Sequence, residues 1–449
     1  MTGAATPSSP DRQRSRRSVG SYGVDRRPLA VPAYRRLWVA SAVSAVGGSF
    51  SVVAVPTQLF TITGSSAAVG VPAAVSFVAL AFAALPAGAL ADVADRRRLL
   101  LFAQVGAGAT YLLLWAQAVA GLHSVPVLLV LAACQGVSYG TIMTATGAAV
   151  PRLVPAHLLP AATGLSSLVR YTGAVVGPLL AGVLLPVVGL ADLYLLDATA
   201  LIVVVWAVYR LPPLPPSAPP SPASRRAGRG TLVAAVLTGI PEGFRHLFTN
   251  RLLAAVLGVD LAAMVLGMPA ALFPELAERA YGGPAGGGPA LGLLYAAYPT
   301  GVFATGLLSG TFTRARRHGA IMAGAAIAWG CTVVLFAWAP RLWIALSALA
   351  AGGAVNFLLS TFRNAITQAA TTDALRGRIQ GSLTVVLTGG PQAAVLLHGV
   401  AGAAVGARTA VGVGGLLTVL AVVLILLAVP QLRQYEPESP VRCGTGRAG

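Results

Sequence analysis

The stretch that decides the fold runs from Leu37 to Ala91 and reads LWVASAVSAVGGSFSVVAVPTQLFTITGSSAAVGVPAAVSFVALAFAALPAGALA, 55 residues without one charge. A membrane-spanning helix needs about 20 apolar residues. The stretch is therefore long enough for two spans, which we expect to be joined by a tight turn at residues 63–66. A second charge-free run, of 53 residues, covers Leu99 to Pro151 and breaks between Gly121 and Pro126, which predicts another pair.

The same arithmetic predicts eight more spans in the rest of the chain. They are Leu159–Val187, Leu193–Val208, Leu252–Phe273, Pro289–Thr313, Ala320–Ala339, Leu342–Phe362, Ile379–Ala401 and Thr409–Leu432. We therefore expect an all-α membrane protein with twelve transmembrane helices in two six-helix halves, residues 37–210 and 246–432. Residues 211–245 are rich in Pro, Ser and Arg and predict a cytoplasmic linker. Residues 1–36 predict a disordered cytoplasmic tail, and residues 433–449 a second cytoplasmic tail.

Composition and charge exclude a soluble globular domain. Hydrophobic residues make up 56% of the chain and charged residues only 10%, and the net charge is +18. All 31 basic residues are Arg, and 27 of them fall on the side of the membrane that carries the N-terminus. The other side has only Arg279, Arg341 and Arg408. Because basic loops stay in the cytoplasm, both termini are predicted to be cytoplasmic, and the basic balance does not indicate a nucleic acid partner.

Two segments of the first half have similar segments in the second half, and the number of residues between the matching positions is nearly the same for both. The loop Gly88-Ala-Leu-Ala-Asp-Val-Ala-Asp-Arg-Arg-Arg matches the segment from Gly306 to Arg316 at an offset of 218 residues. The segment from Val154 to Leu158 matches that from Thr371 to Leu375 at an offset of 217 residues. Parallel six-span repeats place a substrate site between the halves, near the middle of the membrane.

The loop that begins at Gly88 resembles the signature loop between helices two and three of the major facilitator superfamily. Three other segments resemble its bacterial siderophore-exporter branch, which includes the enterobactin exporter: Tyr34-Arg-Arg-Leu-Trp, Val150-Pro-Arg-Leu-Val-Pro and Asp373-Ala-Leu-Arg-Gly-Arg-Ile. The resemblance implies a monomeric secondary transporter of the bacterial inner membrane that works by alternating access. It also implies proton-coupled efflux of a small amphiphilic molecule, such as a siderophore, drug or secondary metabolite.

Gly88, Asp92, Asp95, Arg96 and Arg97 are the candidates for a conformational gate. Acids beside a cluster of Arg can exchange partners as neighbouring helices move, and Asp92 is expected to cap a short turn there. The alternative is a solvated basic loop that only sets the topology, although topology does not require the two acids.

The fifth predicted span contains Gly173, Gly177, Pro178 and Gly182. Glycines four residues apart let a neighbouring helix approach, and the proline weakens the backbone hydrogen bonding, so the helix can bend there. The pattern resembles a motif of proton-driven antiporters, which favours export. Ordinary close packing through small residues is the alternative.

Three ionisable residues fall inside predicted spans, namely Arg170, Asp197 and Asp260. A charge at the bilayer centre costs about 2.5 to 3.5 kcal/mol, so each should face a partner or water. Asp260 is the best placed, about eight residues into its span, and a carboxylate there that takes up and releases a proton is what coupling to a proton gradient requires. The alternative is a structural pair between Arg170 and Asp260 or Asp197.

Further polar side chains could line the cavity or bond between helices, namely Gln58, Gln135, Tyr139, Asn356 and Gln392. Two features of proton-coupled relatives are missing. Ala132 stands where many of them have an Arg three residues before the Gln, and Ser49 follows Gly47-Gly48 where exporters often place an acid. Proton coupling therefore rests on the resemblance.

Bond-breaking chemistry is not indicated. The five His and three Cys residues have no metal-ligand spacing, and without Lys there is no phosphate-binding loop of the usual type. We expect no enzyme activity, cofactor or metal, and as partners only a small molecule, protons and the bilayer. An importer of a small nutrient, or a receptor that does not transport, stays open as an alternative.

Overall fold

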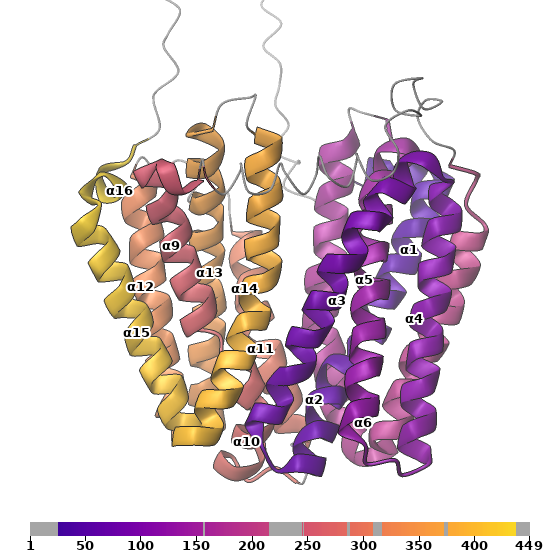
Figure 1. Ribbon diagram of the computed structural model, residues 1–449, viewed down its shortest axis with the longest axis horizontal. Coiled ribbons are helices and arrows are strands. Elements are labelled where there is room, and N and C mark those ends of the chain that lie inside the picture. Colours follow the sequence, from indigo (N-terminus) through magenta and orange to yellow (C-terminus); the bar gives the residue numbers. More distant parts are fainter. Residues whose placement is uncertain are drawn as a thin grey trace, which may run out of the picture.

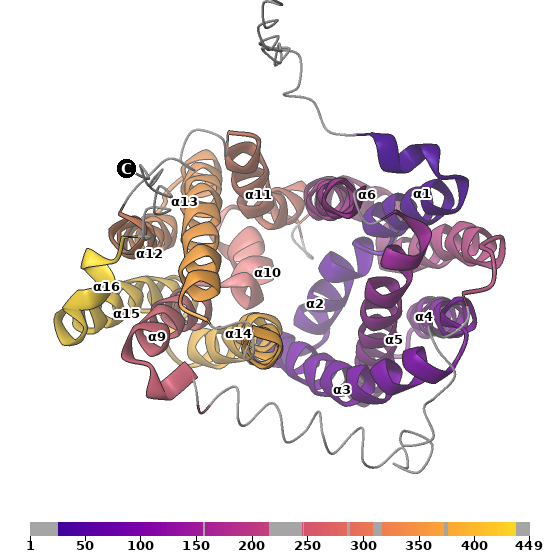
Figure 2. The same ribbon diagram turned by 90° about the horizontal axis from the view of Figure 1, so that it is seen from above.

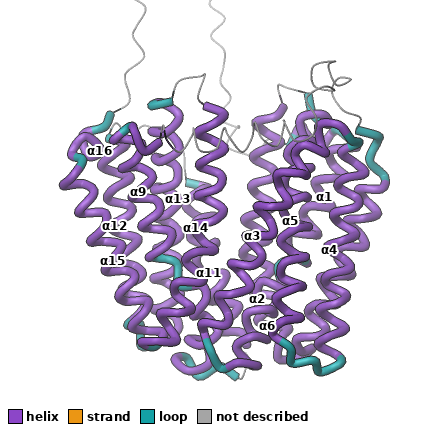
Figure 3. The backbone as a smooth tube through the Cα atoms, viewed as in Figure 1, coloured by secondary structure: helices purple, strands orange, loops and turns teal. Residues whose placement is uncertain are grey.

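The computed structural model describes residues 26–155, 158–214, 245, 247–284, 288–308, 317–371 and 376–436. Within these ranges the chain is helical, with short loops between the helices (Figure 3). In chain order the helices are η1 (Arg27–Ala30), α1 (Pro32–Gly47), α2 (Phe50–Thr63), α3 (Ser66–Val93), α4 (Arg96–Val119), α5 (Val125–Leu153), α6 (Leu159–Tyr209), α9 (Arg251–Leu266), η3 (Ala270–Leu272), α10 (Phe273–Glu275), η4 (Leu276–Ala280), α11 (Gly288–Leu307), α12 (His318–Ala337), α13 (Leu342–Ala369), α14 (Arg376–Val405), α15 (Ala407–Ala428) and α16 (Pro430–Gln434).

The helices form two bundles that stand side by side (Figure 1). Helices α1 to α6 make the first bundle and α9 to α16 the second. Seen from above, α6 lies beside α11 and α3 beside α14, so two helix pairs join the bundles (Figure 2). Residues 215–244, most of the predicted linker, lie outside the described residues.

Helical structure begins before residue 36, the predicted end of the N-terminal tail. Helix α1 starts at Pro32. The N–H groups in the first turn of a helix have no acceptor within the helix, so a proline, which has no N–H, costs no hydrogen bond there. The side chain of Tyr34 is 1% exposed, and its hydroxyl donates to the carbonyl of Ala162 in α6 at 2.9 Å. This anchor makes residues 27–36 part of the first bundle, so the predicted tail is too long.

The two turns predicted in the first bundle are confirmed. Helix α2 ends at Thr63, and Gly64 follows with a φ of 63°, a conformation that glycine adopts without strain. Helix α4 ends at Val119 and α5 begins at Val125, with Gly121 again at a φ of 63° between them.

Ten segments of the described chain are long and apolar enough to cross a membrane. One of them, Ala161–Tyr209, contains a break, because Gly189 has φ 83° and ψ 174° inside α6. Helix α14 has 30 residues but is not among the ten. Helix α13 continues to Ala369 instead of ending at Phe362. Arg363 therefore lies inside a helix, whereas the sequence predicted it in a cytoplasmic loop.

The first span of the second bundle is interrupted, where the sequence predicted one span from Leu252 to Phe273. Helix α9 ends at Leu266, and three short turns, η3, α10 and η4, continue the chain. Trp329 of α12 accounts for the break, because its indole Nε1 donates to the carbonyl of Ala263 at 2.9 Å. A side chain at Gly267 would collide with that indole.

Helices approach most closely where a glycine faces a neighbouring backbone. Gly136 of α5 lies against the carbonyl of Ser76 in α3, and Gly301 of α11 against the carbonyl of Ala350 in α13. A Cβ at either glycine would collide with that carbonyl. Close contact between small residues is the main source of helix association in lipid, which gives many of the 52 Gly a packing role.

The two bundles touch near the end where α2 passes into α3, the lower end in Figure 1. Gly70 of α3 lies against Leu396 of α14, and Gly182 of α6 lies against Gly292 of α11. Toward the upper end the ribbons of the two bundles diverge (Figure 1). The halves are thus packed together through small residues at one end.

Candidate functional site

The loop before α4 ties two helices of the first bundle together. Asp95 is the N-cap of α4, and its Oδ1 accepts from the backbone N–H of Arg97 at 2.9 Å and from that of Leu214 at 3.1 Å. The backbone N–H of Arg96 donates to the carbonyl of Leu214 at 3.2 Å. Asp95 thus joins the start of α4 to the segment that follows α6.

Arg97 strengthens the same connection. Its guanidinium donates to the carbonyl of Tyr209 and lies 5.3 Å from the centre of that ring. Among the described residues, the partners of Asp95 and Arg97 in these contacts all belong to the first bundle. Helix α3 continues through Asp92, so the capping residue of this loop is Asp95. The side chain of Asp92 and the surroundings of Gly88 lie outside the described part, and their gate role stays a prediction.

The glycine motif of the fifth span has two packing faces. Gly173 and Gly177 lie against Ala45 and Ser49 of the first span, and a Cβ at either would collide there. On another face, Gly182 and the carbonyl of Pro178 lie against Gly292 of α11. The only residue of α6 with non-helical φ and ψ is Gly189, and the bend at Pro178 stays a prediction. The motif therefore supports close contact both within the first bundle and between the bundles.

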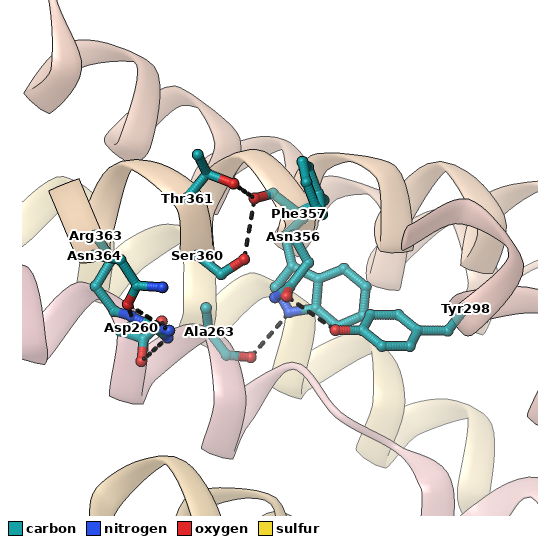
Figure 4. Close-up of polar contacts among 10 residues, drawn as sticks. Asp260, Ala263, Tyr298, Asn356, Phe357, Ser360, Thr361, Arg363 and Asn364 are labelled. Carbon is teal, nitrogen blue, oxygen red and sulfur yellow. Dashed lines mark hydrogen bonds and ion pairs between the residues drawn. The ribbon is translucent and has the colours of Figure 1, made fainter. Parts of the chain in front are cut away.

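Asp260 lies in a buried ion pair with Arg363 (Figure 4). Nη1 of Arg363 is 2.7 Å from Oδ1 and 2.8 Å from Oδ2 of the carboxylate. The side chains are 2% and 9% exposed, for Asp260 and Arg363 respectively. The alternative in which Asp260 pairs with Arg170 is therefore wrong. The partner comes from α13, 103 residues later in the chain.

Neighbouring amides complete this polar cluster of α9, α11 and α13. Asn364 accepts from Nε of Arg363 at 3.2 Å and from its Nη2 at 3.1 Å, so every nitrogen of the guanidinium has a partner. The hydroxyl of Tyr298 donates to Oδ1 of Asn356 at 2.9 Å, on the same face of α13 (Figure 4). Asn356 was predicted as a site residue, whereas Tyr298, Arg363 and Asn364 were not.

Asp197 occupies a different site, inside the first bundle. It is fully buried, and its Oδ2 accepts from both the backbone N–H of Ser51, at 2.8 Å, and the Ser51 hydroxyl. Ser51 lies in the first turn of α2, just after the interruption that separates α2 from α1. A carboxylate stabilises the exposed N–H groups at a helix start. Exporters often have an acid directly after the glycines where this chain has Ser49. In this protein Asp197, from α6, places a carboxylate next to that segment.

Of the other predicted polar residues, Gln58 joins helices instead of lining an opening. It exchanges two side-chain hydrogen bonds with Gln117, at 3.1 and 3.0 Å, and accepts a third from Tyr194 at 2.8 Å. Gln135 is half-buried and Tyr139 is exposed on α5. These two remain candidates for an opening between the bundles.

A polar contact that the sequence did not reveal crosses between the bundles at their lower end. The hydroxyl of Ser66 in α3 donates to Glu275 of α10. Arg279 is 3.1 Å from the same carboxylate, and its guanidinium lies 5.4 Å from the centre of the Phe60 ring in α2. We call Ser66, Glu275, Arg279 and Phe60 the lower latch, because they connect the two bundles.

A family model of transmembrane secretion effectors matches residues 25–442, almost the whole chain. The chain belongs to the transmembrane secretion effector family. The enterobactin exporter EntS of Citrobacter koseri is 30% identical over 417 residues, covering 92% of this chain and 95% of that protein. EntS of Salmonella paratyphi A is also 30% identical, covering 91% and 95%. These relatives confirm the resemblance to the exporter branch, and this secretion effector is a multi-pass membrane transporter, not an enzyme.

Solved structures of transporters share its fold. A bacterial homologue of the human lysosomal transporter Spinster, in an inward-facing and unoccupied conformation, has a TM-score of 0.68 at 16% identity and covers 92% of this chain and 99% of that one. The nucleoside transporter NupG has a TM-score of 0.69 at 14% identity for its D323A mutant, covering 88% and 99%. At such identities the likeness establishes the fold of the secretion effector alone.

Proposed function

We propose that the chain is a proton-coupled exporter of a small amphiphilic molecule in a bacterial inner membrane. Export is supported by relatives named as exporters that align over 92% of the chain. The basic residues support cytoplasmic termini, because 26 of the 31 fall in segments on that side even without Arg363, which lies inside α13. Siderophores, drugs and secondary metabolites are the cargo classes that fit such a transporter.

The proposed topology has twelve spans in two repeats. The break at Gly189 divides one of the ten candidate segments into two, and α14 adds a further span. The pairs α3 with α14 and α6 with α11 lie at related positions in the two halves, which supports an internal repeat. The offsets of 217 and 218 residues between matching loops support it as well.

We propose that the bundles rock against each other to expose a central site to one side of the membrane at a time. The contacts at the lower end support this mechanism, since small residues and the lower latch join the bundles there. For the site to open at that end, the bond between Ser66 and Glu275 must break. Asp92, near the opposite end of α3, is our candidate for a gate that forms in the alternate state.

The ion pair between Asp260 and Arg363 is the observation that carries the coupling proposal. A buried pair of this kind is stable only while both members are charged, because loss of one charge leaves the other without compensation. Proton uptake by Asp260 would free Arg363 and loosen α9 from α13, next to Tyr298 on the helix that contacts the first bundle. A proton carried by Asp260 would thereby change the contact between the halves.

Transport by the purified protein in liposomes tests this proposal. With enterobactin as the first cargo and ethidium as the second, we expect an imposed pH gradient to drive accumulation. Asp260→Asn mimics the protonated acid, so it should retain passive exchange and lose gradient-driven accumulation. If Asp260→Asn accumulated cargo at the wild-type level, Asp260 would be a structural partner of Arg363, and Asp197 would be the next carboxylate to replace.

A further inference from the structure

Arg170 is a charged residue inside a membrane-spanning helix, α6, and it takes part in none of the polar contacts described above. It follows the start of α6 at Leu159 by eleven residues, about 16 Å along the helix at 1.5 Å per residue. Its side chain is exposed. A charged side chain at such a depth must face a water-filled space or a partner, because lipid does not solvate it.

The packing of α6 defines the side of the helix on which Arg170 lies. At about 100° per residue, Gly173 and Gly177 face α1, and Pro178 and Gly182 face α11 on the opposite side. Arg170 lies between these two faces. The two sides that remain differ in composition, and this difference shows which of them is turned toward lipid.

One remaining side of α6 is almost entirely apolar, with Val176, Val183 and Val187 along it. The other side carries Thr163 and Arg170 near the upper end of the helix. Toward the lower end this polar side continues through Ala181 and Leu185, which are 0% and 8% exposed. It is therefore covered by protein at the lower end and open above, which places Arg170 on the inner surface between the bundles.

An aromatic ring of the same helix lies close to this arginine. The guanidinium of Arg170 is 5.0 Å from the centre of the Tyr171 ring. Helix α6 packs against α11, which carries Tyr298, and the hydroxyl of Tyr298 donates to Asn356 of α13. Arg170 and Tyr171 therefore lie on the helix that joins the first bundle to α11, the helix that carries Tyr298.

Of the two arginines Arg170 and Arg363, only Arg363 has a carboxylate partner among the described residues. Asp260 is already paired with Arg363, and Asn364 occupies the remaining nitrogens of that guanidinium. Within the described residues, the guanidinium of Arg170 contacts the ring of Tyr171, and no carboxylate pairs with it. Among these described residues, Asp260 and Arg363 neutralise each other, and the charge of Arg170 remains.

We propose that Arg170 and Tyr171 form the binding site for an anionic aromatic cargo, with the anionic group on the guanidinium and the ring beside Tyr171. Guanidinium groups bind carboxylates and phenolates through paired charge-assisted hydrogen bonds. An organic anion would supply the charge that the cluster lacks. This inference rests on the proposed transport function and adds the chemical class of its cargo.

Equilibrium binding to the full-length protein in lipid nanodiscs tests the inference with three probes of one size. These are radiolabelled 1-naphthoate, 1-naphthylmethanol and 1-naphthylmethylammonium, which differ in charge. We expect the anion to bind at least about tenfold more tightly than the cation. Arg170→Gln should weaken naphthoate binding about tenfold and change binding of the neutral alcohol less than twofold. Arg170→Lys should keep most of the preference for the anion.

Arg152→Gln is the matched control, since it removes an exposed arginine from the end of α5. It should bind all three probes as the wild type does. Equal binding of anion and cation by the wild type, no naphthoate binding, or undiminished naphthoate binding by Arg170→Gln would each overturn the inference. The assay requires neither a gradient nor turnover, so its outcome is independent of whether the protein proves to be a proton-coupled exporter.

Discussion

Replacing Asp260 by Asn should destabilise the second bundle strongly. The substitution leaves the guanidinium of Arg363, whose side chain is 9% exposed, without a counter-charge. Removing one member of a buried ion pair typically costs about 3 to 5 kcal/mol. At about 2 to 4 °C per kcal/mol for a unit of 150 to 250 residues, the lower figure corresponds to a fall of about 6 to 12 °C in the unfolding temperature.

The assay is thermal unfolding of the purified protein in detergent, followed by the fluorescence of its tryptophans. The matched control is the double variant Asp260→Asn with Arg363→Gln, which removes both charges and leaves two groups that can hydrogen-bond. We expect it to unfold within about 1.5 kcal/mol of the wild type, since neutral replacement of a buried pair is often tolerated. The reasoning is refuted if the single variant unfolds at the wild-type temperature, or if the double variant is no more stable than the single one.

Three further predictions concern the junctions between helices. Ser66→Ala removes the bond to Glu275, worth about 0.6 to 1.7 kcal/mol in membrane proteins. It should raise the population open at that end about three- to twentyfold, measured as the distance between spin labels on α3 and α14. Gly177→Ala should lower stability by about 1 to 3 kcal/mol in thermal unfolding, whereas Gly164→Ala, where the added Cβ meets nothing within 4 Å, should not. Asp92→Asn should reduce transport about tenfold with membrane insertion intact, measured in liposomes per amount of protein.

Each of these predictions has a contrary result. An unchanged spin-label distance in Ser66→Ala would show that the bond to Glu275 does not bias the two states. Equal unfolding temperatures for Gly177→Ala and Gly164→Ala would mean that the first span shifts to accommodate the added methyl group at little cost in stability. Full transport activity of Asp92→Asn would remove this residue from the gate.

The sequence predicted the helices well, because the spans are delimited by local features. Charge-free runs have a length set by the membrane, and the turns contain glycines that adopt positive φ, such as Gly64 and Gly121. The family was also recognisable, since its motifs are short contiguous segments. The start of α1 was placed too late because Arg35 and Arg36 resembled a solvated tail, whereas Tyr34 anchors this segment to α6.

The side-chain partners could not be predicted in the same way. Arg363 was taken as the end of a span, since a charge usually marks the interface. A signal was present, because Ile366 and Thr367 follow at helical spacing on the same buried face, so the helix continues past the charge. Its pairing with Asp260 depends on how two distant helices meet, and so does the bond between Ser51 and Asp197. Such contacts depend on tertiary packing, which the periodicity of one helix does not specify.

The bond between Asp197 and Ser51 has a consequence for the biogenesis of the protein. Ser51 belongs to the first span, whereas Asp197 is synthesised 146 residues later. Until α6 is complete, the backbone N–H of Ser51, close to the N-terminus of α2, lacks its final acceptor, and the first span remains unfinished during translation. The first bundle should therefore mature as one unit after its last helix has left the ribosome, and a nascent chain truncated before Asp197 should be a preferred target for membrane proteases.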